Sequence, residues 1–213
     1  MADQRSDGLL IIGADSWVRD LAKAIVSANV PVKIVDTNFA KVSLAKQAGL
    51  DAVCINMLNE HAREELELAG IGKLLAMTPN DEVNSLIVRE CRAMFERKNG
   101  FQLMFDPGKL KSRRGVTKNL MGRALFHEGA TYTRFRERHD LGSSFKVTPL
   151  SEEFTYAAFA KKYQDNFELL AVISEDGKLT LETPEKPLQP NPGDRILTLV
   201  GSIVIPDEHP VGV

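Results

Sequence analysis

The chain lacks several features that would assign it to a class at once. Its 213 residues carry 27 Lys and Arg against 29 Asp and Glu, which gives a formal net charge of −2. This balance produces no general attraction to a polyanion, so we expect no binding to nucleic acid. No stretch approaches the roughly 20 consecutive apolar residues that cross a bilayer, so we expect the residues of this chain to be soluble.

Cysteine is also scarce. The two cysteines, Cys54 and Cys91, lie within apolar runs and have neither a CxxC partner nor a histidine at metal-ligand spacing. We therefore expect two reduced thiols in the core and no metal site.

Short apolar runs and amphipathic segments, in contrast, alternate regularly between residues 9 and 105. The amphipathic segments have helical spacing, which implies right-handed crossovers and a parallel sheet covered on both faces. The sequence therefore predicts an α/β fold with a Rossmann-like doubly wound parallel sheet. Its expected strands are Leu9–Ile12, Val32–Val35, Ala52–Ile55, Leu74–Met77 and Phe101–Phe105.

From residue 143 onward the apolar period changes to two, which is typical of half-buried strands. We expect a Rossmann-like domain at residues 8–141 and a small C-terminal α+β module at residues 143–201. Residues 106–122, with five Lys or Arg within ten positions, are expected to form a mobile surface loop. The strands expected after residue 122 are Arg123–Phe126, Phe145–Leu150, Phe167–Ser174, Lys178–Glu182 and Arg195–Val200.

The turn after the first strand, Gly13-Ala14-Asp15-Ser16, occupies the place of a phosphate-binding turn. Only the first glycine of the G-x-G-x-x-G pattern is present, because Asp15 replaces the second and Val18 the third. The turn is therefore a weak match to the pattern.

Three further groups follow the expected strands, at the edge where ligands of doubly wound sheets bind. Asp36 ends the second strand, where it would accept hydrogen bonds from ribose hydroxyls, or would belong to the start of the next helix. Asn56 and Met57 follow the third strand and form either an adenine-side loop or an ordinary loop. Thr78 and Asn80 follow the fourth strand, where they contact a ligand or cap a helix that begins with Thr78 as its N-cap.

The carboxylate of Asp15 decides which ligand we expect. A carboxylate about 4 Å from a phosphate oxygen is repelled by roughly 4 kcal/mol at an effective dielectric constant near 20. As an N-cap, Asp15 would instead accept hydrogen bonds from the amides of the first helical turn. This interpretation favours AMP over NAD(H) as the adenine nucleotide, or no ligand at all.

The segments "LLIIGADSWVRDLAKAI", "VKIVDTN" and "ELAGIGKLLAMTPNDEVNSL" together resemble the RCK (TrkA-N) domains, which are regulatory units of potassium channels and cation transporters. Residues 143–201, ending in "NPGDRILTLVG", look like the companion TrkA-C module. The stretch "RALFHEGATYTRFRERHDL" is most similar to the cytoplasmic C-terminal regions of bacterial sodium/proton antiporters.

This resemblance implies nucleotide-sensing control of cation transport at the cytoplasmic side of the inner membrane. It also implies a homodimer formed through the RCK-type domain, and a membrane transporter part in the same polypeptide or in a partner subunit. By position, the resemblance places residues 13–16 at the phosphates, Asp36 at the ribose, Asn56 and Met57 beside the adenine, and Thr78 with Asn80 facing the phosphates.

Two alternatives remain open. The first is a ligand-free dimerisation and docking module, which the degenerate turn favours. The second is an NAD-dependent oxidoreductase, which needs a proton donor beside the nicotinamide. None of the four histidines lies in a recognisable motif and we expect them to be solvated, so we do not expect an enzyme. Trp17, the single tryptophan, is expected at the mouth of the nucleotide site.

Overall fold

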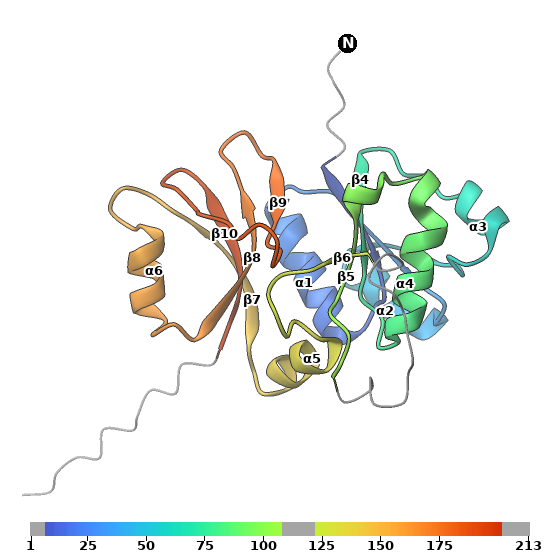
Figure 1. Cartoon of the computed structure of the whole chain (residues 1–213), viewed down its shortest axis with the longest axis horizontal. Helices are drawn as coiled ribbons and strands as arrows, with labels where there is room; N and C mark the ends of the chain where they lie inside the picture. The colour runs from blue at the N-terminus through green and yellow to red at the C-terminus, as the bar shows by residue number, and fades with distance from the viewer. Residues whose placement is uncertain (1–6, 108–121, 202–213) are drawn as a thin grey trace, which may run out of the picture.

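A computed structural model describes residues 7–107 and 122–201 of the chain. Its first sheet is parallel and six-stranded, in the order β3-β2-β1-β4-β5-β6 (Figure 1). The chain order reverses between β1 and β4, which is the switch point of a doubly wound fold. The strands are β1 (Gly8–Ile12), β2 (Val32–Asp36), β3 (Asp51–Cys54), β4 (Ile71–Ala76), β5 (Gly100–Gln102) and β6 (Arg123–Ala124).

Helices cover both faces of this sheet because its strands are apolar on both sides. Along β1, Leu9 and Ile11 belong to the core on the side of α1, whereas Leu10 and Ile12 belong to the core on the side of α4. The helices of this part are α1 (Ser16–Ser27), α2 (Phe39–Gln47), α3 (Glu60–Glu64), α4 (Asp81–Glu90) and α5 (Tyr132–Asp140), with short 3-10 turns η1 (Cys91–Ala93) and η2 (Arg97–Asn99).

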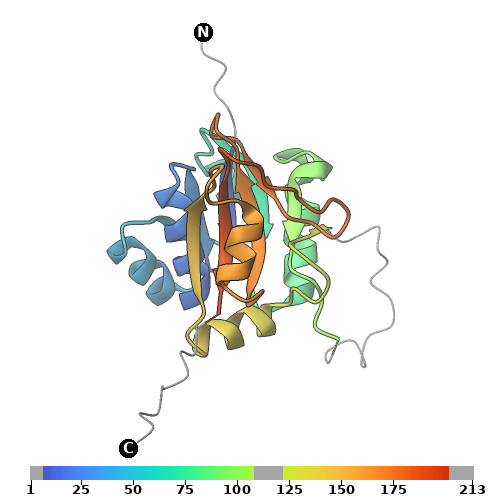
Figure 2. The ribbon, with the colours of Figure 1, turned by 90° about the vertical axis from the view of Figure 1, so that its left-hand side faces the viewer.

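The second sheet is antiparallel and four-stranded, in the order β7-β10-β8-β9. Figure 2 shows it with α6 toward the viewer. On that side, Phe159 of α6 is fully buried against Val172 of β8 and Ile196 of β10. Its elements are β7 (Ser144–Pro149), α6 (Tyr156–Lys162), β8 (Phe167–Ile173), β9 (Leu179–Leu181) and β10 (Arg195–Val200).

The two sheets share one hydrophobic core, in which α1 lies between them (Figure 1). Trp17 of α1 is fully buried there, with its ring 5.4 Å from Phe135 of α5 and 6.5 Å from Phe145 of β7. The expectation that Trp17 lies at the mouth of the nucleotide site is therefore wrong. Trp17 is the second residue of α1, and its side chain lies on the helix face that packs against the second sheet.

The fold class predicted from the sequence is confirmed, with differences at some boundaries. Expected strand 101–105 ends at Gln102, and expected strand 123–126 ends at Ala124. Cys91 is buried, and burial raises its pKa to about 11, but Cys54 is exposed rather than part of the core. The boundary between the two expected domains stays a prediction, and residues 108–121 of the expected mobile loop lie outside the described residues.

Candidate functional site

A pocket of about 350 Å³ lies at the carboxyl ends of β1, β2, β3 and β4. This is the edge at which doubly wound sheets bind ligands. Six of the nine residues selected from the sequence line the pocket, namely Gly13, Asp36, Asn56, Met57, Thr78 and Asn80. The tertiary structure thus brings together four segments that are far apart in the chain.

Gly13 closes the turn between β1 and α1. Its φ of +114° is a backbone conformation that L side chains rarely adopt. A Cβ atom built on Gly13 would also lie 2.8 Å from the carbonyl oxygen of Met77, just beyond β4. Glycine is therefore required here both by the backbone conformation and by the close approach of a neighbouring segment.

Asp36 ends β2 and organises the turn from the side. One carboxylate oxygen accepts a hydrogen bond from the amide of Ala14 at 2.8 Å, and the other accepts one from the amide of Asn38 at 2.8 Å. An ionised carboxylate has about four acceptor positions, so each oxygen keeps one for another donor. Asp36 therefore supports the local structure and still presents acceptors to the pocket.

The remaining turn residues do not line the pocket. Ala14 is fully buried, and Ser16 is exposed at the first position of α1. Asp15 is the N-cap residue of α1, but its side chain makes no capping hydrogen bond and is instead paired with the ammonium group of Lys41 in α2. The prediction that Asp15 caps the first turn of α1 is therefore wrong.

Lys41 is a site residue that was not predicted from the sequence. It lies in the first turn of α2, where Asn38 is the N-cap and accepts a hydrogen bond from the Lys41 amide at 3.2 Å. Because α2 begins just after Asp36, its first turn adjoins the first turn of α1, and Lys41 both lines the pocket and neutralises Asp15. That position in the first turn is the signal that would have identified it.

The segment after β4 differs from the prediction in its cap. Asn80, not Thr78, is the N-cap of α4, and its side chain accepts hydrogen bonds from the amides of Glu82 and Val83. Thr78 is held by the buried Asn84, whose side-chain oxygen accepts from the Thr78 hydroxyl at 2.7 Å and whose side-chain nitrogen donates to the Thr78 carbonyl at 2.9 Å. Both candidates therefore have a structural role at the rim of the pocket.

Asn56 and Met57, which follow the third strand and line the pocket, differ in burial. Met57 is 2% exposed and packs in the core on the side of α4. Asn56 is exposed, and its side chain accepts a hydrogen bond from the amide of Leu58 at 3.0 Å. Met57 thus lies in the core directly beneath the pocket, and Asn56 shapes the loop beside it.

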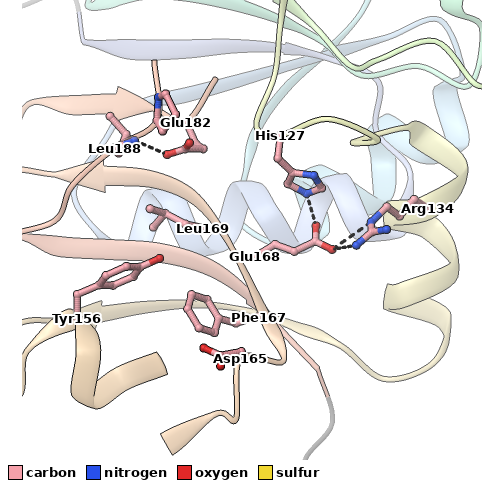
Figure 3. Close-up of a pocket in the computed structure, with 10 residues that line it drawn as sticks. His127, Arg134, Tyr156, Asp165, Phe167, Glu168, Leu169, Glu182 and Leu188 are labelled. Carbon is pink, nitrogen blue, oxygen red and sulfur yellow. Dashed lines mark hydrogen bonds and ion pairs between the residues drawn. The ribbon is translucent and has the colours of Figure 1, made fainter. Parts of the chain in front are cut away.

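A second pocket of about 500 Å³ lies where the two sheets meet (Figure 3). Glu168 of β8, with a side chain 7% exposed, points from its wall to three basic side chains. Its carboxylate is bonded to His127 at 2.8 Å, to Arg134 at 2.6 Å and to Arg138 at 2.5 Å. Burial alone would raise the pKa of Glu168, but the hydrogen bonds from these three groups outweigh it and lower the pKa to about 2.

This cluster is not predicted by the sequence pattern, because its members are up to 41 residues apart in the chain. The hydrogen bond to Glu168 raises the pKa of His127. His139 also has a carboxylate partner, Asp20 of α1, at 2.9 Å. The expectation of solvated histidines is wrong for these two residues, whereas the His61 side chain is 95% exposed and His209 lies outside the described residues.

Comparison with known proteins gives one family match. Residues 9–102 match the TrkA-N domain. The match covers somewhat less than half of the chain and runs from β1 to the end of β5, so it includes every candidate residue of the first pocket. A comparison with curated proteins found no match.

Several solved structures have a similar fold. The NAD(P)-binding domain of an exopolyphosphatase-related protein from Archaeoglobus fulgidus is 24% identical, with a TM-score of 0.41, and the match covers 49% of this chain and 77% of that one. The TrkA-N domain of the inner membrane protein ybaL from Escherichia coli is 21% identical, with a TM-score of 0.38, over 46% of this chain and 70% of that one. The GsuK channel bound to NAD is 15% identical, with a TM-score of 0.46, and the match covers 94% of this chain but 38% of the channel chain.

The GsuK structure with NAD bound contradicts the expectation that AMP is favoured over NAD(H). The structure of the present chain supplies a physical reason for the error. The predicted repulsion assumed an unpaired carboxylate at Asp15, but Lys41 balances that charge beside the turn. The aspartate that replaces the second glycine of the motif therefore does not place an uncompensated negative charge beside the pocket.

Two further observations concern membranes and metals. Within residues 7–107 and 122–201, no helix is both long enough and apolar enough to cross a bilayer. In the same part of the chain, no three His, Cys, Asp or Glu side chains are grouped so as to hold a metal ion.

Proposed function

We propose that this chain is the regulatory part of a monovalent-cation transporter and that it senses NAD(H) in the pocket at the carboxyl ends of β1 to β4. The observation that carries the proposal is the convergence of six predicted site residues on that pocket, within the segment that matches the TrkA-N domain. The sodium/proton antiporter type is part of this proposal, and it rests on the resemblance of the segment at residues 123–141.

The proposed binding mode assigns a role to each side of the pocket. Asp36 accepts hydrogen bonds from the ribose hydroxyls with its two free acceptor positions. The same carboxylate repels a 2′-phosphate, so NAD(H) is preferred to NADP(H). Lys41 stays paired with Asp15 and also donates to the pyrophosphate, so the charge of Asp15 remains compensated, and the adenine lies at the side of the pocket lined by Asn56 and Met57.

The lining of the pocket favours a sensor over a dehydrogenase. Hydride transfer requires a substrate and a proton donor beside the nicotinamide. In the described part of the chain, the residues that line this pocket include no histidine, tyrosine or cysteine, and the one lysine among them is paired with Asp15. A nucleotide that is bound here without a reactive group beside it can use its binding free energy to change the conformation of the protein.

Regulation further requires two arrangements with different affinities for the ligand, because a ligand that binds both equally shifts no equilibrium. We propose that these are two arrangements of a homodimer formed through the Rossmann-like part. A change from one arrangement to the other would be transmitted to a membrane transporter part, in the same polypeptide or in a partner subunit, at the cytoplasmic side of the membrane.

Isothermal titration of the chain with NADH and NAD⁺ tests the binding site. We expect saturable binding at one site per chain and a loss of at least about tenfold in affinity in Asp36→Asn, because one charged hydrogen-bond acceptor is removed. Asp51→Asn is the matched control, because Asp51 lies at the amino end of β3, away from the pocket at the carboxyl ends of the strands, and pairs with Lys33. The absence of saturable binding, or an equal loss in both variants, would overturn the proposed site.

Two measurements test the regulatory role separately from binding. Sedimentation velocity is expected to show a dimer whose sedimentation coefficient changes when NADH is added, and a monomer under both conditions would contradict the dimer. The reading frame around the gene is expected to encode apolar membrane spans, either upstream of Met1 or in an adjacent transporter gene. A genomic context with neither would remove the transporter assignment.

A further inference from the structure

A third cleft, of about 390 Å³, lies toward the amino ends of the parallel strands. The proposed NAD(H) pocket, called the nucleotide pocket below, lies at their carboxyl ends. The walls of the cleft come from the amino-terminal parts of β4, β5 and β6 and from the edge strand β9 of the second sheet. In Figure 1 these amino ends point toward the labelled N-terminus. A backbone hydrogen bond from Phe126 to Glu182, 2.8 Å long, joins the two sheets nearby.

The lining of this cleft is strongly basic. Among the residues that the structure describes, its lining contains five cationic side chains and no acidic one, although the whole chain has a net charge of −2. The charge is therefore concentrated locally rather than spread over the surface. The five cationic residues are Lys73, Lys98, Arg123, Lys178 and Lys186.

Carboxylates outside the lining compensate this charge only in part. Lys98 pairs with Glu96 at 2.7 Å and Arg123 with Glu185 at 3.4 Å, but both carboxylate side chains are about 70% exposed. Exposed ion pairs of this kind contribute little to the free energy of folding, so these carboxylates hold the two cations only weakly. Lys73 pairs with Asp7 at 3.3 Å, and within the described residues neither remaining lysine is paired with a carboxylate. At least two positive charges at the cleft thus have no ion-pair partner among the residues that the structure describes.

The cleft also has ordered walls. Phe101 is 4% exposed, and the guanidinium group of Arg123 lies over its ring at 5.0 Å. The same guanidinium donates to the carbonyl oxygen of Lys98 at 3.1 Å, which fixes its position. Thr180 and Asn99 add neutral hydrogen-bonding groups to the lining. The cationic groups therefore surround a concave and partly apolar surface instead of extending from a flat one.

We propose that this cleft binds a small soluble ligand that carries two or more phosphate groups. Several ammonium groups around a concave surface attract a multiply charged anion, and lysine is a common phosphate ligand. The volume lies in the range of small-molecule sites. Because the lining comes from both sheets, the bound ligand would tie β9 to the amino edge of the parallel sheet.

This site is independent of the nucleotide pocket, because the two lie at opposite ends of the parallel strands. Isothermal titration of the full chain with sodium tripolyphosphate tests it. In Lys178→Ala/Lys186→Ala we expect the affinity to fall by at least about tenfold, since two charge-assisted contacts are removed. Raising the salt concentration should weaken binding to the unmodified chain more than to this variant.

Two control variants make the test specific. Lys46→Ala/Lys161→Ala removes the same charge from exposed positions on α2 and α6 and should leave the affinity within about twofold. Lys41→Ala in the nucleotide pocket should also leave it unchanged, which separates this site from the proposed NAD(H) site. Absence of saturable binding, or equal losses in the two double variants, would overturn the proposal.

Phosphate groups are also present in lipid headgroups, so a second arm uses vesicles of phosphatidylglycerol. We expect tripolyphosphate to bind and the chain not to sediment with the vesicles. Sedimentation that depends on Lys178 and Lys186, without binding of tripolyphosphate, would show a lipid surface instead and overturn the soluble ligand.

Discussion

At the scale of single residues, Glu168 is a carboxylate that pairs with three basic side chains. It is nearly buried, and His127, Arg134 and Arg138 all donate to it. Its pKa, lowered to about 2, lies below the unfolded value, so its pairing stabilises the fold above about pH 4.5. That contribution is lost as the pH falls toward 2. His127 has a raised pKa, so its contribution is complete below its unfolded value of 6.5 and is lost as the pH rises through its folded pKa.

Glu168→Gln should lower the free energy of unfolding by about 3 kcal/mol at pH 5.5, because it leaves basic groups without their buried counter-charge. The variant should also lose less stability than the unmodified chain between pH 4.5 and pH 2, since it has no carboxylate to protonate there. Urea unfolding at several pH values measures both effects. Glu137→Gln, at an exposed position on α5, should change the stability by less than about 0.5 kcal/mol. Parallel pH profiles for the Glu168 variant and the unmodified chain would contradict this account.

Other single residues show what sequence alone left open. The pattern located Asp15 and Asp36 at the correct turn and strand end, because strand ends can be read from apolar runs. It did not reveal that Lys41 pairs with Asp15, since that contact depends on how α1 and α2 pack side by side. The charge of Asp15 was visible in the sequence, but its compensation was not.

At the scale of elements, the turn between β1 and α1 depends on the end of β4. A Cβ atom of any other residue at position 13 would lie only 2.8 Å from the carbonyl oxygen of Met77. This contact arises because β1 and β4 are parallel neighbours and end at the same edge of the sheet. The first glycine of the motif is therefore explained by packing, whether or not a ligand binds.

Gly13→Ala should lower the free energy of unfolding by about 3 kcal/mol or more, because it combines backbone strain with a steric clash. Gly49→Ala is the matched control. Gly49 also has a positive φ, +78°, but a Cβ there would meet no atom within 4 Å, so only the conformational cost of about 1 kcal/mol remains. Urea unfolding of both variants measures the difference. Equal losses would show that the contact with Met77 relaxes without cost.

The start of α4 differs from the position that the local sequence predicts. Thr78 followed by Pro79 has the composition of a helix start, yet α4 begins two residues later with Asn80 as its cap. Asn84, fully buried, binds Thr78 instead and holds it outside the helix. Both Thr and Asn are good N-cap residues. The contact between Thr78 and Asn84, six residues apart, therefore determines that Asn80 is the N-cap.

At the scale of the whole molecule, one core joins the two sheets. Trp17, Phe126, Phe135 and Tyr132 form an aromatic cluster between α1, α5 and the second sheet, with ring centroids 5.3 to 5.5 Å apart for the contacting pairs. Leu170 and Leu197 of the second sheet belong to the same buried cluster. The two expected domains therefore share apolar surface that neither would bury alone.

We expect a single cooperative unfolding transition, in which Trp17 fluorescence and far-UV circular dichroism change together. Phe135→Ala should lower the midpoint seen by both probes to the same extent, with a loss of about 3 kcal/mol from a buried aromatic ring. Arg136→Ala, on the exposed side of α5, is the control and should leave the midpoint nearly unchanged. Two separate transitions, or a midpoint that falls for one probe only, would show that the domains unfold independently.

The sequence by itself determined the fold class, the order of strands and helices, and the strand ends where Asp36, Asn56 and Thr78 lie, because apolar periodicity and turn residues act locally along the chain. Only the tertiary structure decided which side chains meet. Lys41 reaches Asp15, Glu168 gathers three basic groups, and five cations surround one cleft because helices and strands distant in sequence pack together. The identity of a partner across such a contact depends on packing, which has no short-range signal in the sequence.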